Sequence, residues 1–145
     1  MNTMGSDRER GSVTVEAVLL APAVLVLVFL VIFGGRWAIA QQAVEAAASE
    51  AARAASISRS PGEANGSASA MAGTSLSEQN VRCSSQSVGV DTSGFGAPVG
   101  TTAQVSVTVT CVVDMSDLAA PGIPGARTLT ATMSSPLDTY RGRQG

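Results

Sequence analysis

The sequence predicts an α+β protein in which a long N-terminal helix with a transmembrane part continues into a small extracytoplasmic domain. Three observations predict this architecture. Residues 17–35 form an uncharged apolar run, residues 36–57 are rich in Ala and contain no Pro or Gly, and the residues after about position 80 alternate between apolar and polar side chains. These patterns are typical of a membrane helix, a soluble helix and a half-buried antiparallel sheet.

The composition excludes several classes of function. A chain of 145 residues allows one small domain with accessory segments. The net charge is −2, with nine Arg, no Lys and no His, so no basic patch for nucleic acid is expected. Without His the usual general base near neutral pH is missing, and two Cys cannot build a four-ligand zinc site. We therefore expect no enzyme, no catalytic residue, no metal site, no cofactor and no nucleic-acid partner.

The apolar run has the length of a membrane helix. Its nineteen residues cover roughly 28 Å at about 1.5 Å per residue, close to the ~30 Å of the hydrocarbon core. A lone segment in lipid must satisfy its backbone hydrogen bonds internally and is therefore helical, despite its many Val residues. Pro22 lies in this run and removes one backbone donor. We expect a kink there and not a break.

Three interpretations of this segment are open. It is a plain single-pass anchor, or it is a cleaved secretory signal, for which Arg8 and Arg10 supply a basic start and Ala-Ile-Ala at 38–40 a cleavage site. In the third interpretation the preceding residues are a processing signal of another kind, because Glu16 follows Gly11 by five positions. A carboxylate at the bilayer centre costs about 2.5 to 3.5 kcal/mol, so Glu16 either extends into the headgroups or has a partner.

The stretch RGSVTVEAVLLAPAVL resembles the processing site of type IV prepilins and pseudopilins, in which a short charged leader ends in Gly and a Glu stands fifth in the mature chain. The resemblance implies a leader over residues 1–11, cleaved by a prepilin peptidase after Gly11 to leave Ser12 as the first residue. It also implies that Glu16 pairs with the free α-amine of a neighbouring subunit and takes part in subunit assembly.

The Ala-rich stretch extends the predicted N-terminal helix over residues 12–57, of which 17–35 are transmembrane. Its straight-chain residues are good helix formers. Small side chains recur at helical spacing, which lets another helix or the soluble domain approach closely. They are Ala40, Ala43, Ala47, Ala51 and Ala54. The alternative is an Ala-rich exposed helix with solvated Glu45, Glu50 and Arg53.

Residues 58–145 are predicted to form the small extracytoplasmic domain. Ser60 and Glu63 match a capping box with Pro61 at the first helical position, which predicts a second helix from Pro61 to about Glu78.

Three strands are predicted after this helix. The clearest covers residues 102–114, whose apolar face consists of Ala103, Val105, Val107, Val109, Cys111 and Val113. An earlier strand begins at Val81 and Cys83, and its phase shift indicates a bulge or turn near Gln86. A third and shorter alternation consists of Leu129, Ala131 and Met133. Loops with Pro and Gly separate the strands.

Cys83 and Cys111 are the only cysteines, and each lies in a predicted strand with its side chain on the apolar face. An even number of cysteines in a domain outside the cytoplasm indicates a disulfide. Two buried free thiols are the alternative. A redox or catalytic role has no support, because there is no CxxC motif and no nearby base.

Most of residues 8–145 resembles the TadE-like pseudopilin family of Tad (Flp-type) pilus systems. The matching stretches are RGSVTVEAVLLAPAVL, EAAASEAARAAS, QVSVTVTC, SDLAAPGIPG and SSPLDTYRG. The resemblance implies a pilin-like fold and a minor pseudopilin that initiates or caps a pilus, with other pilin or pseudopilin subunits, the pilus assembly machinery and a prepilin peptidase as partners.

The resemblance also implies a location. The chain would be a single-pass protein of the cell membrane, with a cytoplasmic N-terminus, an extracytoplasmic C-terminal domain and a place in a cell-surface pilus. The alternative function is a membrane-tethered binding module, an adhesin or sensor, with residues 92–101 and 115–126 as its candidate surfaces.

Overall fold

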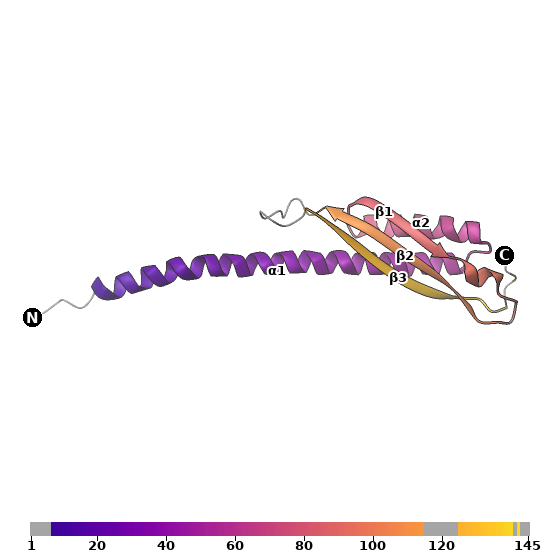
Figure 1. Cartoon of the computed structure of the whole chain (residues 1–145), viewed down its shortest axis with the longest axis horizontal. Coiled ribbons are helices and arrows are strands. Elements are labelled where there is room, and N and C mark those ends of the chain that lie inside the picture. Colours follow the sequence, from indigo (N-terminus) through magenta and orange to yellow (C-terminus); the bar gives the residue numbers. More distant parts are fainter. Residues whose placement is uncertain (1–6, 115–124, 141, 143–145) are drawn as a thin grey trace, which may run out of the picture. The chain divides into compact units, whose positions relative to one another are not determined.

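The structure is a computed structural model that describes residues 7–114, 125–140 and 142, with side chains from residue 15 onward. The elements follow in the order α1 (Asp7–Ser56), α2 (Pro61–Glu78), β1 (Cys83–Asp91), the 3₁₀ turn η1 (Ser93–Gly96), β2 (Ala103–Asp114) and β3 (Ala126–Leu137) (Figure 1). The predicted α+β class is confirmed. The chain forms two compact units, Met1–Trp37 and Ala38–Gly145. The second unit includes the end of α1 because that part of the helix belongs to the core.

Helix α1 agrees with the predicted N-terminal helix at one end and differs at the other. It ends at Ser56, one residue before the predicted end, and it passes through Pro22 without a break. It begins at Asp7, inside the segment interpreted as a leader. Residues 7–10 contain neither Pro nor Gly, so this part of the segment is compatible with a helix.

Helix α2 has the predicted bounds and the predicted cap. The Ser60 hydroxyl accepts the Glu63 backbone N–H at 3.3 Å. The Glu63 carboxylate accepts a backbone N–H in return, but from Arg59 at 2.9 Å and not from Ser60 itself. Both contacts satisfy backbone donors at the start of the helix, which would otherwise lack partners.

The C-terminus of α2 explains why β1 begins later than predicted. Asn80 has a left-handed backbone with φ of 57°. Its N–H bonds to the Ser77 carbonyl at 3.0 Å, and the Val81 N–H bonds to the Leu76 carbonyl at 3.0 Å. This is the Schellman pattern of hydrogen bonds. Val81 therefore belongs to the helix cap and not to the strand, which begins at Cys83.

The three strands form one antiparallel sheet in the order β1-β2-β3, with β2 in the centre. The register of β1 shifts between Cys83 and Ser85, so the irregularity predicted near Gln86 lies closer to the start of the strand. The apolar face of β2 is as predicted, since Val105, Val107, Val109 and Cys111 are all buried.

Strand β3 is longer than predicted, with 12 residues. Leu129 and Ala131 are buried as predicted, but Met133 is 36% exposed, and Leu137 is the next buried apolar residue. Because β3 is an edge strand, its inner face is less completely covered than that of the central strand β2. The edge position also accommodates Pro136, which cannot donate to a ladder.

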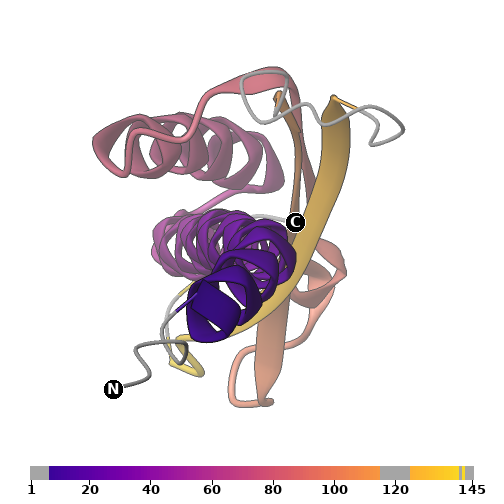
Figure 2. The same ribbon diagram turned by 90° about the vertical axis from the view of Figure 1, so that its left-hand side faces the viewer.

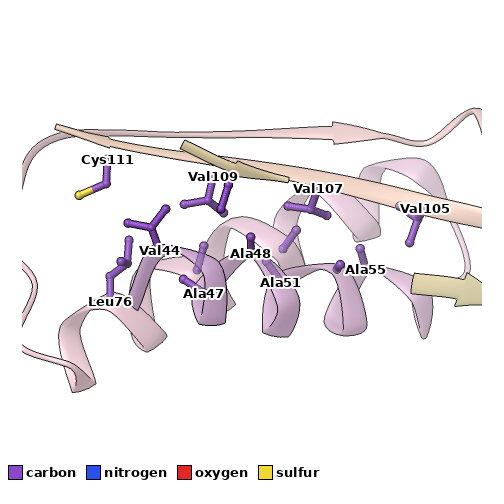
Figure 3. Close-up of a cluster of buried hydrophobic side chains, with 14 of the residues drawn as sticks. Val44, Ala47, Ala48, Ala51, Ala55, Leu76, Val105, Val107, Val109 and Cys111 are labelled. Carbon is purple, nitrogen blue, oxygen red and sulfur yellow. The ribbon is translucent and has the colours of Figure 1, made fainter. Parts of the chain in front are cut away.

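The core lies between the sheet and both helices, which pack on the same side of it (Figure 2). The Ala-rich face of α1 lies opposite the Val row of β2 (Figure 3). On α1 the fully or nearly buried residues are Ala40, Ala43, Val44, Ala47, Ala48, Ala51, Ala52 and Ala55. The packing interpretation of the stripe is thereby confirmed, except that Ala54 is only half-buried and Ala55 takes its place. Small side chains at this face permit the close approach of helix and sheet.

The opposite face of the sheet is lined with hydroxyl groups. Three cross-strand pairs join β2 to β3, namely Thr108 to Thr132 at 2.8 Å, Thr110 to Thr130 at 3.3 Å and Ser106 to Ser134 at 3.1 Å. Such pairs stabilise antiparallel strands on an exposed face.

Replacement of Ala51 by Leu is expected to destabilise the domain. Ala51 is fully buried in the core, so the added carbon atoms must displace the helix or the sheet, at a cost of about 1 to 3 kcal/mol. Ser49→Leu on the exposed side of the same helix is the matched control. Denaturant unfolding of both variants in detergent, followed by circular dichroism, measures the difference. Equal free energies of unfolding would contradict the packing.

Candidate functional site

The N-terminal part of α1 exposes a continuous apolar surface. The large apolar side chains from Val15 to Ile32 are 48 to 70% exposed, apart from Phe29 at 36%. The rings of Phe29 and Phe33 stack one turn apart, with centroids 6.3 Å from each other. Each such side chain gains about 1.5 to 3 kcal/mol on leaving water. This segment therefore requires lipid or partner helices around it.

Within the described residues there is one helix long and apolar enough to cross a membrane, Val15–Ser56, and none of its most apolar window is buried. The apolar segment is thus compatible with single-pass membrane anchoring. The charged and amide residues Arg36, Gln41 and Gln42 follow it on the same helix, as expected where a helix leaves the hydrocarbon region.

The predicted processing residues Gly11 and Ser12 both lie within α1. The peptide bond between them is therefore part of a helix in this structure. Ser12 and Glu16 are four residues apart, which puts them on the same face of the helix.

The Glu16 side chain is exposed at the N-terminal edge of the apolar surface. One turn further along lie Leu19 and Leu20, which cannot pair with a carboxylate. In the part of the chain that the structure describes, Glu16 has neither an ion pair nor a hydrogen bond from a side chain.

The alternative cleavage site at 38–40 lies in the interior of α1. Ala40 is only 7% exposed and is the first core residue of the helix. In the folded chain this site is part of a continuous helix, in which Ala40 is buried and Ile39 is 62% exposed.

Cys83 and Cys111 form the predicted disulfide, with a Cα–Cα distance of 5.4 Å. The bond joins the first residue of β1 to the buried face of β2, beside the shift of register in β1. No free cysteine remains in the sequence, so the alternative of two free thiols is wrong.

The first candidate surface of the binding alternative, residues 92–101, is largely exposed but is anchored in the core at one residue. It contains η1, whose Phe95 is only 2% exposed and belongs to the core. A Cβ atom at Gly94 would overlap the Gln104 carbonyl oxygen, so a residue without a side chain is needed there. Phe95 was not predicted as a core residue, although it is the only aromatic residue in that loop.

The same connection begins with a local hydrogen bond that affects the charge of Asp91. The Ser93 backbone N–H donates to the Asp91 carboxylate at 3.0 Å. This bond, together with one from the Ser93 hydroxyl, lowers the pKa of Asp91 below its usual value. The side chain is fully solvated, so the effect is to fix the turn and to keep the carboxylate ionised. Of the second candidate surface, 115–126, residues 115–124 lie outside the described residues.

The comparisons with known proteins give one match. Residues 11–53 match the model of the family described as TadE-like protein. This stretch contains the Gly11 and Glu16 signature, the apolar segment and most of the Ala-rich face of α1. No curated protein and no solved structure matches the chain.

Proposed function

Because residues 11–53 match the family model of TadE-like proteins, we propose that the chain is a membrane-anchored minor pseudopilin that helps to initiate or cap a Tad-type pilus. Its role is structural and not catalytic. The partners are other pilin or pseudopilin subunits and the assembly machinery, after a prepilin peptidase has removed residues 1–11.

The carboxylate of Glu16 is the observation that carries this proposal. It is an exposed acidic group at the edge of an exposed apolar helix, without a partner in the described part of the chain. A plain anchor gains nothing from a charge at this position, since charged groups near the hydrocarbon region are unfavourable unless they are paired. An assembling helix gains a contact, because the α-amine of Ser12 in a neighbouring subunit is a cation at the same depth.

The division of α1 is compatible with this role. Its first part, residues 15–33, exposes apolar side chains that can contact lipid or other helices. Its second part, from Ala40 to Ala55, contributes buried side chains to the core of the folded domain. A subunit built in this way holds its extracytoplasmic domain on the same helix that engages its neighbours. The proposed orientation puts the disulfide domain outside the cytoplasm, where a disulfide persists.

The binding-module alternative receives less support from the described residues. The loop at 92–101 is fixed by Phe95 in the core and by a hydrogen bond from the Gly100 N–H to the Thr139 carbonyl at 2.9 Å. It therefore has fixed points on both sides of its exposed residues. A tether for such a module would also not require Glu16.

Mass spectrometry of the mature N-terminus tests the processing step. In cells that contain the dedicated peptidase, the mature protein is expected to begin at Ser12, with a free or methylated amine. The same measurement in a strain without the peptidase is the control and should give residue 1. A mature chain that begins at Gln41 would instead establish a secretory signal, and an uncleaved chain in the presence of the peptidase would establish a plain anchor.

A further inference from the structure

The two cysteines of the disulfide differ in exposure. Cys111 is 0% exposed and lies at the same end of the core as Leu76 and Val44 (Figure 3). Cys83 is only partly buried, and it is the first residue of β1, an edge strand of the described sheet. Thiol–disulfide exchange requires access to the sulfur that is attacked. The two cysteines are therefore not equivalent toward another molecule.

An open hollow in the surface leads to Cys83. It has a volume of about 370 Å³ and lies where α2 ends and β1 begins. Its walls include Leu76, Asn80, Arg82, Cys83 and Gln86, whereas Cys111 is not among the residues that line it. A second molecule can thus reach Cys83 from the solvent, but it can reach Cys111 only if the core opens.

The charge beside Cys83 favours exchange at this residue. Arg82 is exposed, makes no ion pair within the described residues, and is the one charged residue among those that line the hollow. Glu78 at the end of α2 and Asp114 at the end of β2 do not line it. A guanidinium group stabilises a nearby thiolate, which is the form of cysteine that attacks disulfides.

We propose that this hollow is the site at which a dithiol–disulfide oxidoreductase acts on the domain, with Cys83 as the residue that forms the mixed disulfide. The chain is the substrate of this reaction and not its catalyst. The inference rests on the extracytoplasmic orientation in the proposed function, and it adds a partner that is not a pilus subunit.

The oxidation proceeds in two steps. The Cys83 thiolate attacks one sulfur of the enzyme's disulfide, and the other enzyme sulfur leaves as a thiolate. The Cys111 thiolate then attacks the Cys83 Sγ atom, which closes the bond and releases the first enzyme sulfur. The cysteine pair loses two electrons to the enzyme, and the two thiol protons end on the enzyme's dithiol. Cys111 has to reach only Cys83, at a Cα–Cα distance of 5.4 Å, so it can stay in the core.

Reaction of the oxidised full-length protein with reduced glutathione, in detergent, tests the assignment of Cys83. By microscopic reversibility, the sulfur that a thiolate attacks when the bond opens is the one that carries the mixed disulfide when the bond forms. The reaction is stopped with acid, free thiols are alkylated with N-ethylmaleimide in denaturant, and peptides are analysed by mass spectrometry. We expect about tenfold more glutathione on Cys83 than on Cys111.

The control for this measurement is the same reaction in guanidinium chloride, where the two cysteines should carry comparable amounts of glutathione. Equal amounts in the folded protein, an excess on Cys111, or no glutathione on either cysteine would overturn the proposal.

Substitution of Arg82 tests the effect of the charge. Arg82→Ala is expected to react with glutathione about twofold to threefold more slowly, because an exposed positive charge beside the sulfur is lost. Arg59→Ala is the matched control, since Arg59 is also exposed but precedes α2 and does not line the hollow. Equal rates for the two variants would show that Arg82 has no part in the site.

Two single-cysteine chains identify the partner in cells. In Cys111→Ala the mixed disulfide at Cys83 cannot be resolved and should accumulate, whereas Cys83→Ala should give about tenfold less adduct. Both chains lack the bond, so each is the other's control for folding. The adduct should dissociate on reduction and contain a protein with a two-cysteine active site. No such adduct, an adduct only with a second copy of the chain, or equal adducts from both chains would overturn the proposal.

The state of the wild-type chain in cells separates this inference from the proposed function. Two free thiols in the wild-type chain would show that the proposed orientation is wrong. An oxidised wild-type chain without a preference for Cys83 in the glutathione reaction would overturn only the oxidoreductase site and leave the pseudopilin function standing.

Discussion

Substitution of Glu16 by Ala is expected to abolish the association of this protein with other pilus subunits while it leaves membrane insertion intact. The carboxylate is exposed, and it has no partner within the described residues of its own chain. In an assembly, by contrast, its removal would leave the Ser12 amine of a neighbouring subunit unpaired in a medium of low dielectric constant. Loss of one member of a buried charge pair costs about 3 to 5 kcal/mol, which corresponds to a loss of roughly 10² to 10⁴ in affinity.

The measurement is co-purification of pilus subunits with the detergent-solubilised protein, together with counts of pili on the cells. Glu50→Ala is a matched control, because Glu50 is an exposed carboxylate of the same helix but lies in the soluble domain. The abundance and the processed N-terminus of both variants should equal those of the wild type. Normal piliation and undiminished association in the Glu16→Ala strain would favour the membrane-tethered binding module.

Removal of the disulfide is expected to cause the largest loss of domain stability. The bond closes a loop with a sequence separation of 28 residues, and the loop-entropy relation gives about 3 to 4 kcal/mol for a loop of this size. Such a loss is a large share of the roughly 5 to 15 kcal/mol that stabilises an ordinary domain. The core consists largely of Ala and Val, so it has few large side chains to compensate.

Denaturant unfolding of the Cys83→Ala and Cys111→Ala double variant measures this contribution. The wild-type protein reduced with dithiothreitol is the control, because it loses the bond without losing the two sulfur atoms from the core. Both should unfold at a lower denaturant concentration than the oxidised wild type. Equal midpoints for reduced and oxidised wild type would show that the bond does not stabilise the fold.

The sequence by itself determined those features that depend on local spacing. The length and apolarity of 17–35, the alternation along β2 and the capping box at Ser60 each predict one element, because the responsible contacts lie within a few residues of one another. The disulfide could also be predicted, since the chain contains only two cysteines. Local spacing did not predict that Ala55 is buried and Ala54 only half-buried. Both residues suit a helix, and the rotation of the helix on the sheet decides which of them is buried.

Only the tertiary structure decided the features that depend on distant neighbours. Val81 has the composition of a strand residue, but its N–H is bonded to the Leu76 carbonyl of the preceding helix. Met133 continues an apolar alternation, yet it remains partly exposed because β3 is an edge strand. Phe95 fills the core from a Gly-rich loop. A pattern along one segment predicts which side chains avoid water. The residues that cover these side chains lie far away in the sequence, so only the tertiary structure identifies them.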